Sequence, residues 1–219
     1  MHRQPGGGFL ERIEENLIAL ILGVMTLITF ANVILRKFFA SGLLWGLEAT
    51  VFLFGWLVLL GASYAVKKNA HLGVDALINV LAPPARRALA LVAVALCIAY
   101  AFLLLKGSWD YWANFANLPR TEGRWFPTGF QESFRGQGWY EVNDIPMPGW
   151  LRWLEDVFNE GEEYEKIPRL IPYAVLPLGS ALLLLRFLQA AVAIWKGKTD
   201  RIVASHEVED EIADLAEGR

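Results

Sequence analysis

An uncharged run of 18 residues, from Ala49 to Val66, constrains this chain more than any other feature of its sequence. A helix that crosses the roughly 30 Å hydrocarbon core of a bilayer needs about 20 predominantly apolar residues. Charge closes the run at both ends, with Glu48 before it and Lys67-Lys68 after it. A helix on the surface of a soluble protein would carry a polar face, which this run lacks. It therefore predicts a membrane-spanning helix.

Three further apolar runs have the length of a span: residues 17–35, 88–105 and 171–195. Hydrophobic residues make up 55% of the chain, above the roughly 45–50% apolar content of a soluble domain. We therefore predict an all-α integral membrane protein with four transmembrane helices. The first three lie within residues 17–106 and the fourth within 171–196.

The segments outside the spans carry their own helical patterns. Residues 1–16 begin with a glycine-rich tip and continue as an amphipathic helix, expected to lie along the membrane surface. A short interfacial helix is expected at about 71–82, ended by Pro83-Pro84 because proline cannot continue a helix. Residues 197–219 form a polar, acidic tail.

A long polar connection, residues 107–170, separates the third and fourth spans and holds six of the nine tryptophans. We expect short helices and irregular loops there, with an amphipathic helix at about 149–159. Its predicted apolar face contains Trp150, Trp153, Leu154, Val157 and Phe158, and its predicted polar face contains Arg152, Glu155 and Asp156. Trp150 and Trp153 then either cover the bundle at the headgroup level, where tryptophan is favoured, or form a docking surface for another protein. The two readings are compatible.

The distribution of lysine and arginine predicts the orientation. Four spans put both termini on one side, and most Lys and Arg residues of the short segments lie on that side. We therefore expect cytoplasmic termini and a periplasmic 107–170 loop.

Several function classes are excluded by what the sequence lacks. It has no phosphate-binding glycine loop, no HExxH and no GxSxG motif, so we expect no enzyme. No clustered basic face suggests nucleic-acid binding. The single cysteine, Cys97, is expected to pack as a small apolar side chain. The spans hold no facing histidines for haem, and we expect neither a cofactor nor a metal site.

Charged residues near the membrane are the first site candidates. Arg36 and Lys37 either extend to the interface or pair with Glu48 across the first hairpin. His71 and Asp75 are four residues apart, so they share a helical face and either pair or bind a partner's backbone. Arg186 either extends to the surface at the end of the fourth span or pairs with an acidic group of another subunit.

Two further candidates are apolar or small. Gly61 lies one turn from Ala65 in the second span, a pattern that permits close helix contact. Trp56 belongs to an aromatic stripe that we interpret as packing surface.

An ordered set of residues resembles the small membrane subunit of the tripartite ATP-independent periplasmic (TRAP) transporters of bacteria, the DctQ family. The family pattern is an arginine-ended first span, a W-x-x-E entry to the second, a Leu-Gly-Ala exit and then His-x-x-Val-Asp. The residues that carry it are Asn32-Val33, Arg36, Phe38, Trp45, Glu48, Phe52, Trp56, Leu60-Gly61-Ala62, His71, Val74-Asp75, Leu81 and Arg86-Arg87. Two departures are Leu47, where the family often has an acid, and the long 107–170 loop.

The resemblance implies a large membrane subunit (DctM-type) that holds the substrate and sodium sites, and a periplasmic binding protein (DctP-type). The small subunit would then anchor and widen a static scaffold in the lipid bilayer during import of an organic acid, with C4-dicarboxylates favoured. The alternative is a membrane anchor or assembly subunit of a redox complex, which the lack of histidines in the spans disfavours.

Overall fold

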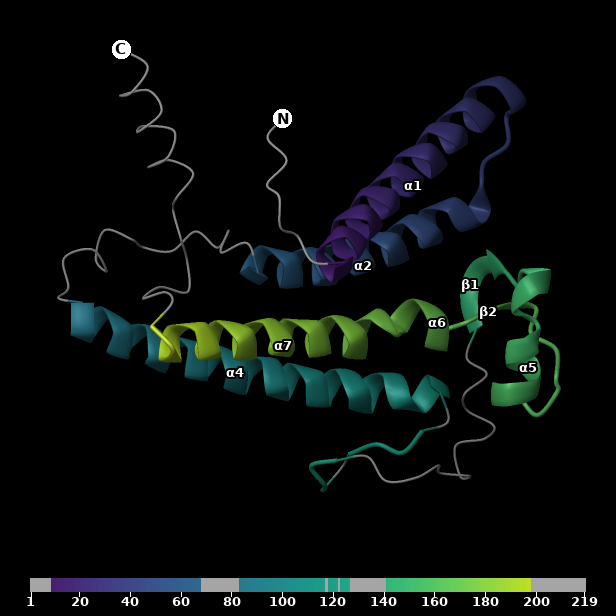
Figure 1. The fold of residues 1–219 in the computed structure, drawn as a ribbon. Helices are drawn as coiled ribbons and strands as arrows, with labels where there is room; N and C mark the ends of the chain where they lie inside the picture. The colour runs from purple at the N-terminus through teal and green to yellow at the C-terminus, as the bar shows by residue number, and fades with distance from the viewer. Residues whose placement is uncertain (1–8, 68–82, 117, 122, 127–140, 198–219) are drawn as a thin grey trace, which may run out of the picture. The chain divides into compact units, whose positions relative to one another are not determined.

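The computed structural model describes residues 9–67, 83–116, 118–121, 123–126 and 141–197 (Figure 1). Four long helices dominate this part: α1 (Phe9–Phe39), α2 (Leu44–Lys67), α4 (Pro83–Ala113) and α7 (Val175–Trp195). Four stretches are long and apolar enough to cross a membrane: Ile13–Phe39, Leu44–Val66, Pro84–Ala116 and Leu170–Trp195. The prediction of four apolar helices with the length of a membrane span is confirmed.

The first helix is longer than the predicted span. α1 runs unbroken from Phe9 to Phe39, so residues 9–16 continue into the span, and the predicted surface helix is not confirmed as a separate element. The chain has no proline between these residues that would interrupt the helix.

The third helix differs from its prediction at both ends. Pro83 and Pro84 begin α4, because proline is tolerated in the first turn of a helix, where its missing N–H has no partner to lose. The helix continues past Lys106, where the predicted span ends, to Ala113. An ion pair of 3.0 Å between Lys106 Nζ and Asp110 Oδ2 supports the extension at the favourable spacing of four residues.

The described part of the long connection contains short elements: η1 (Asn114–Ala116), β1 (Glu141–Pro146), η3 (Gly149–Leu151), α5 (Trp153–Phe158) and β2 (Lys166–Pro168). β1 pairs with β2 in an antiparallel two-stranded sheet, with Glu141 opposite Pro168 and Pro146 opposite Lys166. Figure 1 shows this small sheet beside α5. The expectation of an all-α chain is wrong at this point.

A break separates the short helix α6 (Leu170–Tyr173) from α7. Pro177 explains its position, because a proline ring clashes with the carbonyl four residues earlier, here that of Tyr173.

The chain divides into two compact units, and the dividing points lie within α2, α4 and α7. The first unit comprises residues 1–61 and 104–180, and the second comprises 62–103 and 181–219. In the second unit α4 and α7 run side by side (Figure 1) around an apolar core. Its buried members are Val66, Ala90, Val94, Ala101, Phe187 and Ile194.

Candidate functional site

The most concentrated set of polar contacts lies in the first unit, where the long connection meets the ends of the spans. Glu48, one turn into α2, accepts three hydrogen bonds from the backbone of β1. Its Oε1 lies 2.8 Å from Asn143 N, and its Oε2 lies 2.7 Å from Asp144 N and 3.2 Å from Ile145 N. One carboxylate therefore holds three consecutive strand amides, which would otherwise need water.

The observed partners of Glu48 differ from the pairing across the first hairpin that was one of the two alternatives. The partners of its carboxylate are the amides of β1, which lie 95 to 97 residues away in sequence, and not Arg36 or Lys37. Arg36 instead lies beside the first turn between spans, where its Cγ would be 3.4 Å from a Cβ at Gly42. Asn32 Oδ1 accepts a 3.0 Å hydrogen bond from Leu43 N in the same turn.

Two tryptophans of the spans bind the backbone of α6. The indole Nε1 of Trp56 donates to Pro172 O at 3.0 Å, and that of Trp112 donates to Leu170 O at 2.8 Å. A helix of four residues leaves most of its carbonyls without an intrahelical partner, so side-chain donors satisfy them. The entry to the fourth span is thereby attached to both α2 and α4.

An aromatic cluster surrounds the same point. The ring of Tyr173 stacks on that of Phe115 at a centroid distance of 5.4 Å. It also makes edge contacts with Phe52 at 5.8 Å and with Tyr111 at 5.6 Å. Such pairs each contribute about 0.5–1.5 kcal/mol beyond the area that they bury. The stripe that contains Phe52 and Trp56 is therefore packing surface, as the sequence predicted.

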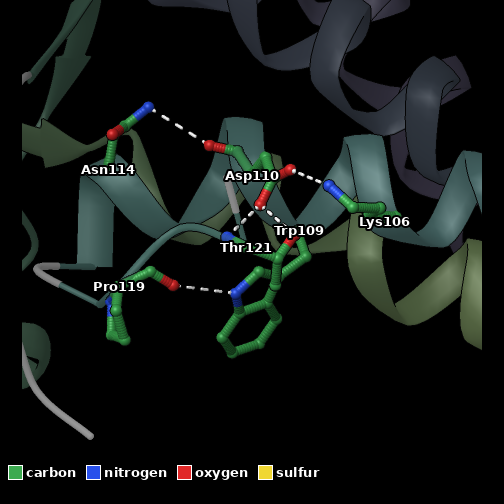
Figure 2. Close-up of polar contacts among 6 residues, drawn as sticks. All are labelled: Lys106, Trp109, Asp110, Asn114, Pro119 and Thr121. Atoms are coloured by element: carbon green, nitrogen blue, oxygen red, sulfur yellow. Dashed lines mark hydrogen bonds and ion pairs between the residues drawn. The ribbon is translucent and has the colours of Figure 1, made fainter. Parts of the chain in front are cut away.

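Asp110 binds the chain back onto the end of α4 (Figure 2). Its Oδ1 accepts from both the backbone N and the Oγ1 of Thr121 at 2.5 Å, while its Oδ2 pairs with Lys106. Beside it, Trp109 Nε1 donates to Pro119 O at 3.0 Å. Asp110 was not among the predicted site residues, although its spacing of four residues from Lys106 was a usable signal.

Glu155 is buried, with only 7% of its surface exposed, which contradicts its predicted place on the polar face of the 149–159 helix. Its Oε1 accepts from Tyr164 N at 3.1 Å and from Arg152 Nη1 at 3.3 Å. The cause is the turn after α5, which folds residues up to Tyr164 back onto this carboxylate. Burial, with Glu141 and Glu155 nearby, raises the pKa of Tyr164 to about 12.

The predicted apolar face of the same segment divides in two. Leu154 is buried and Phe158 packs against the core of the first unit, whose buried members are Phe115, Ala116 and Leu170. Trp150 and Trp153 point outward instead, with 76% and 57% of their surfaces exposed.

The remaining candidates lie in different places. Trp45 is half-buried in the first turn of α2. A Cβ at Gly61 would meet nothing within 4 Å, whereas one at Gly179 would lie 2.8 Å from Leu59 Cβ, so the close helix contact is at Gly179. Arg186 is buried in the second unit, its Nη1 3.0 Å from Gln189 Oε1, and α7 continues past it to Trp195.

Some predictions fall outside the described residues. These are His71 and Asp75, the interfacial helix at about 71–82, and the acidic tail from residue 198 onward.

Glu48, Trp56, Trp109 and Trp112 bind the protein's own backbone, whereas Asp110 and Glu155 bind both backbone amides and other side chains. Within the described ranges, no group of three or more His, Cys, Asp or Glu side chains is placed to hold a metal ion. The arrangement fixes the geometry of an extramembrane segment against the ends of membrane helices.

Residues 25–126 match the family model described as "Tripartite ATP-independent periplasmic transporters, DctQ component". The chain is 52% identical over 209 residues to the C4-dicarboxylate TRAP transporter small permease protein DctQ of Vibrio cholerae, an alignment that covers 95% of this chain and 82% of the relative. It is 33% identical to the protein of that name from Pseudomonas aeruginosa, over 46% of this chain and 60% of the relative. With that of Rhodobacter capsulatus the identity is 26%, over 83% of this chain and 76% of the relative.

Proposed function

Because the chain belongs to the DctQ family, the small permease component of the TRAP transporters, we propose that it is the scaffold subunit of a sodium-coupled importer of C4-dicarboxylates. The observation that carries this proposal is the 52% identity to the Vibrio cholerae protein, named as a C4-dicarboxylate small permease. That alignment covers 95% of the chain, so it includes most of the long connection as well as the spans.

A static role suits the chemistry of the described residues. Ion and substrate sites of transporters are commonly built where a broken helix exposes its backbone. The one break noted above lies between α6 and α7, and the α6 carbonyls of Leu170 and Pro172 already accept hydrogen bonds from Trp112 and Trp56. The substrate and sodium sites therefore belong to a large DctM-type subunit, and a DctP-type binding protein delivers the substrate.

The spans offer apolar surface for the large subunit and for lipid. Exposed large apolar side chains of α2 are Leu44, Leu47, Val51, Phe54 and Val58. Arg36, Trp45, His71, Asp75 and Arg186 remain candidates for subunit contacts or for shaping the hairpins. Both termini lie in the cytoplasm in this proposal, because lysine and arginine of the short segments gather on that side.

Gly61 offers a sharp test of the subunit interface. Its surroundings within this chain are open, so a larger residue leaves the chain's own packing intact. In Gly61→Leu we expect loss of the large subunit during purification while the chain itself stays folded. Gly55→Leu is the control, since a Cβ there also meets nothing within 4 Å. Gly55 is six residues from Gly61 and therefore lies on a different face of α2. Equal recovery of the large subunit from both variants would remove Gly61 from the interface.

The proposal itself is tested by purifying the tagged chain from its native membrane in a gentle detergent. We expect a stoichiometric polytopic partner of the large-subunit type, identified by mass. Recovery of a redox subunit, or of the chain alone, would contradict the proposed function.

A further inference from the structure

An exposed aromatic face stands on the outer side of η3 and α5. Trp150, Trp153 and Val157 follow one another at spacings of three and four residues, which places them on one side of a helical segment. Their exposed fractions are 76%, 57% and 62%. We refer to these three residues as the tryptophan face.

The tryptophan face rests on a fixed base. Beneath it, Leu154 is 4% exposed, and Glu155 binds Tyr164 N and Arg152 Nη1. The two indoles are therefore presented by a packed segment, which reduces the entropy lost when a partner covers them.

Negative charge predominates in the segment that carries the tryptophan face. Residues 149–165 contain six acidic residues and one arginine. The exposed acidic residues are Asp156, Glu160, Glu162, Glu163 and Glu165. The arginine, Arg152, is already 3.3 Å from Glu155 and 3.8 Å from Glu163, so it offers little free positive charge.

This charge pattern favours a protein partner over a lipid surface. Helices that lie on membranes carry lysine and arginine on the polar face, which attracts anionic lipids. The segment around the tryptophan face has the opposite sign. Protein interfaces, by contrast, commonly place tryptophan at the centre and charged residues at the rim.

We propose that the tryptophan face is a docking surface for a water-soluble protein, together with the exposed acidic residues of the same segment, which we call the acidic rim. That protein presents a basic face around an apolar recess. Within the proposed function, on which this inference rests, that protein is the substrate-binding protein. The acidic rim steers the encounter and the two indoles hold the complex, so the association weakens as ionic strength rises.

The test uses the complete transporter, reconstituted in vesicles, with uptake measured as a function of binding-protein concentration. In Trp150→Ala/Trp153→Ala we expect the half-saturating concentration of binding protein to rise about tenfold or more, with the maximal uptake rate unchanged. Trp195→Ala is the matched control, because that indole is 75% exposed but belongs to the other unit. Its half-saturating concentration should match that of the wild type.

Charge is tested separately with Glu162→Gln/Glu163→Gln. We expect a several-fold higher half-saturating concentration at low salt and a weaker dependence on salt than in the wild type. An unchanged half-saturating concentration in both double variants would overturn the inference. A fall in maximal uptake with loss of the assembled complex would also overturn it, since the tryptophans would then be structural.

The two proposals fail in different ways. A wild-type complex that transports nothing at any binding-protein concentration contradicts the proposed function. Quenching of the Trp150 and Trp153 fluorescence by brominated lipids, in an active wild-type complex, contradicts only the docking surface.

Discussion

The second unit and the membrane-end region of the first unit are held together by different means. In the second unit α2, α4 and α7 pack through apolar side chains such as Val94, Phe187 and Ile194. In the first unit, side chains of the long helices hold the backbone of the segments that follow α4. Glu48 binds β1, Trp56 and Trp112 bind α6, and Asp110 binds Thr121.

The difference follows from where the backbone finds its hydrogen bonds. A long helix satisfies its own N–H and C=O groups, so its neighbours need only fill space. A three-residue strand, a four-residue helix and the turns between them leave such groups open. Acidic and indole side chains at the ends of the spans supply the missing partners.

The largest effect is expected from Glu48→Ala. Removing the carboxylate leaves the amides of Asn143, Asp144 and Ile145 to water. We expect the free energy of unfolding to fall by about 2–3 kcal/mol. This is less than the sum for three hydrogen bonds to a charged group, because the site is partly exposed. Thermal unfolding in detergent measures it. Glu165→Ala, an exposed carboxylate nearby, should change little, and equal stability of both variants would contradict the anchoring role.

Gly179→Ala, which probes apolar packing within the first unit, is expected to lower the free energy of unfolding by about 2 kcal/mol. The new Cβ would lie 2.8 Å from Leu59 Cβ, so the two helices must shift apart. Gly55→Ala is the control, since its Cβ would meet nothing within 4 Å and alanine favours a helix. Thermal unfolding of the two variants gives the comparison. If Gly179→Ala is as stable as Gly55→Ala, the close contact between α7 and α2 is not as described.

Trp112→Phe should lower the free energy of unfolding by about 1 kcal/mol, because it keeps an aromatic ring but removes the N–H that donates to Leu170 O. Hydrogen exchange around α6 should accelerate, while exchange in the second unit stays unchanged. Trp195→Phe, at an exposed position, is the matched control. Faster exchange throughout the chain would show that the two regions do not differ in the way described.

Tyr164→Phe should have the smallest effect near neutral pH. The Tyr164 hydroxyl is buried with no hydrogen-bond partner in the described part of the chain, so its removal should leave stability equal or slightly higher.

At higher pH the stabilities of the wild type and of Tyr164→Phe should diverge. The unfolded chain releases the phenol proton near the ordinary pKa of 10.0, whereas the folded chain holds it to about 12. Wild-type stability should therefore fall between these values, and the variant should lose less. Parallel unfolding curves at pH 7 and pH 11 would contradict the buried phenol.

The spans could be predicted because uncharged runs of sufficient length are a property of neighbouring residues. Glu48 could also be singled out as a charge at the end of a span. Its partners could not, because they are backbone amides 95 to 97 residues away, and no side-chain pattern marks them.

The short elements escaped prediction for related reasons. β2 is a three-residue strand that ends in Pro168, and neither its length nor its composition indicates a strand. Glu155 was assigned to the polar face because its neighbours alternate as in an amphipathic helix. The fold-back at Tyr164, which buries Glu155, depends on tertiary contacts that helical spacing does not record.

The most direct test of the central claim is sodium-driven uptake of a C4-dicarboxylate into vesicles that hold the large subunit, with binding protein supplied and this chain present or absent. We expect uptake only when all three components are present. Uptake that is equally fast without this chain, or that occurs with this chain alone, would contradict its role as a scaffold subunit.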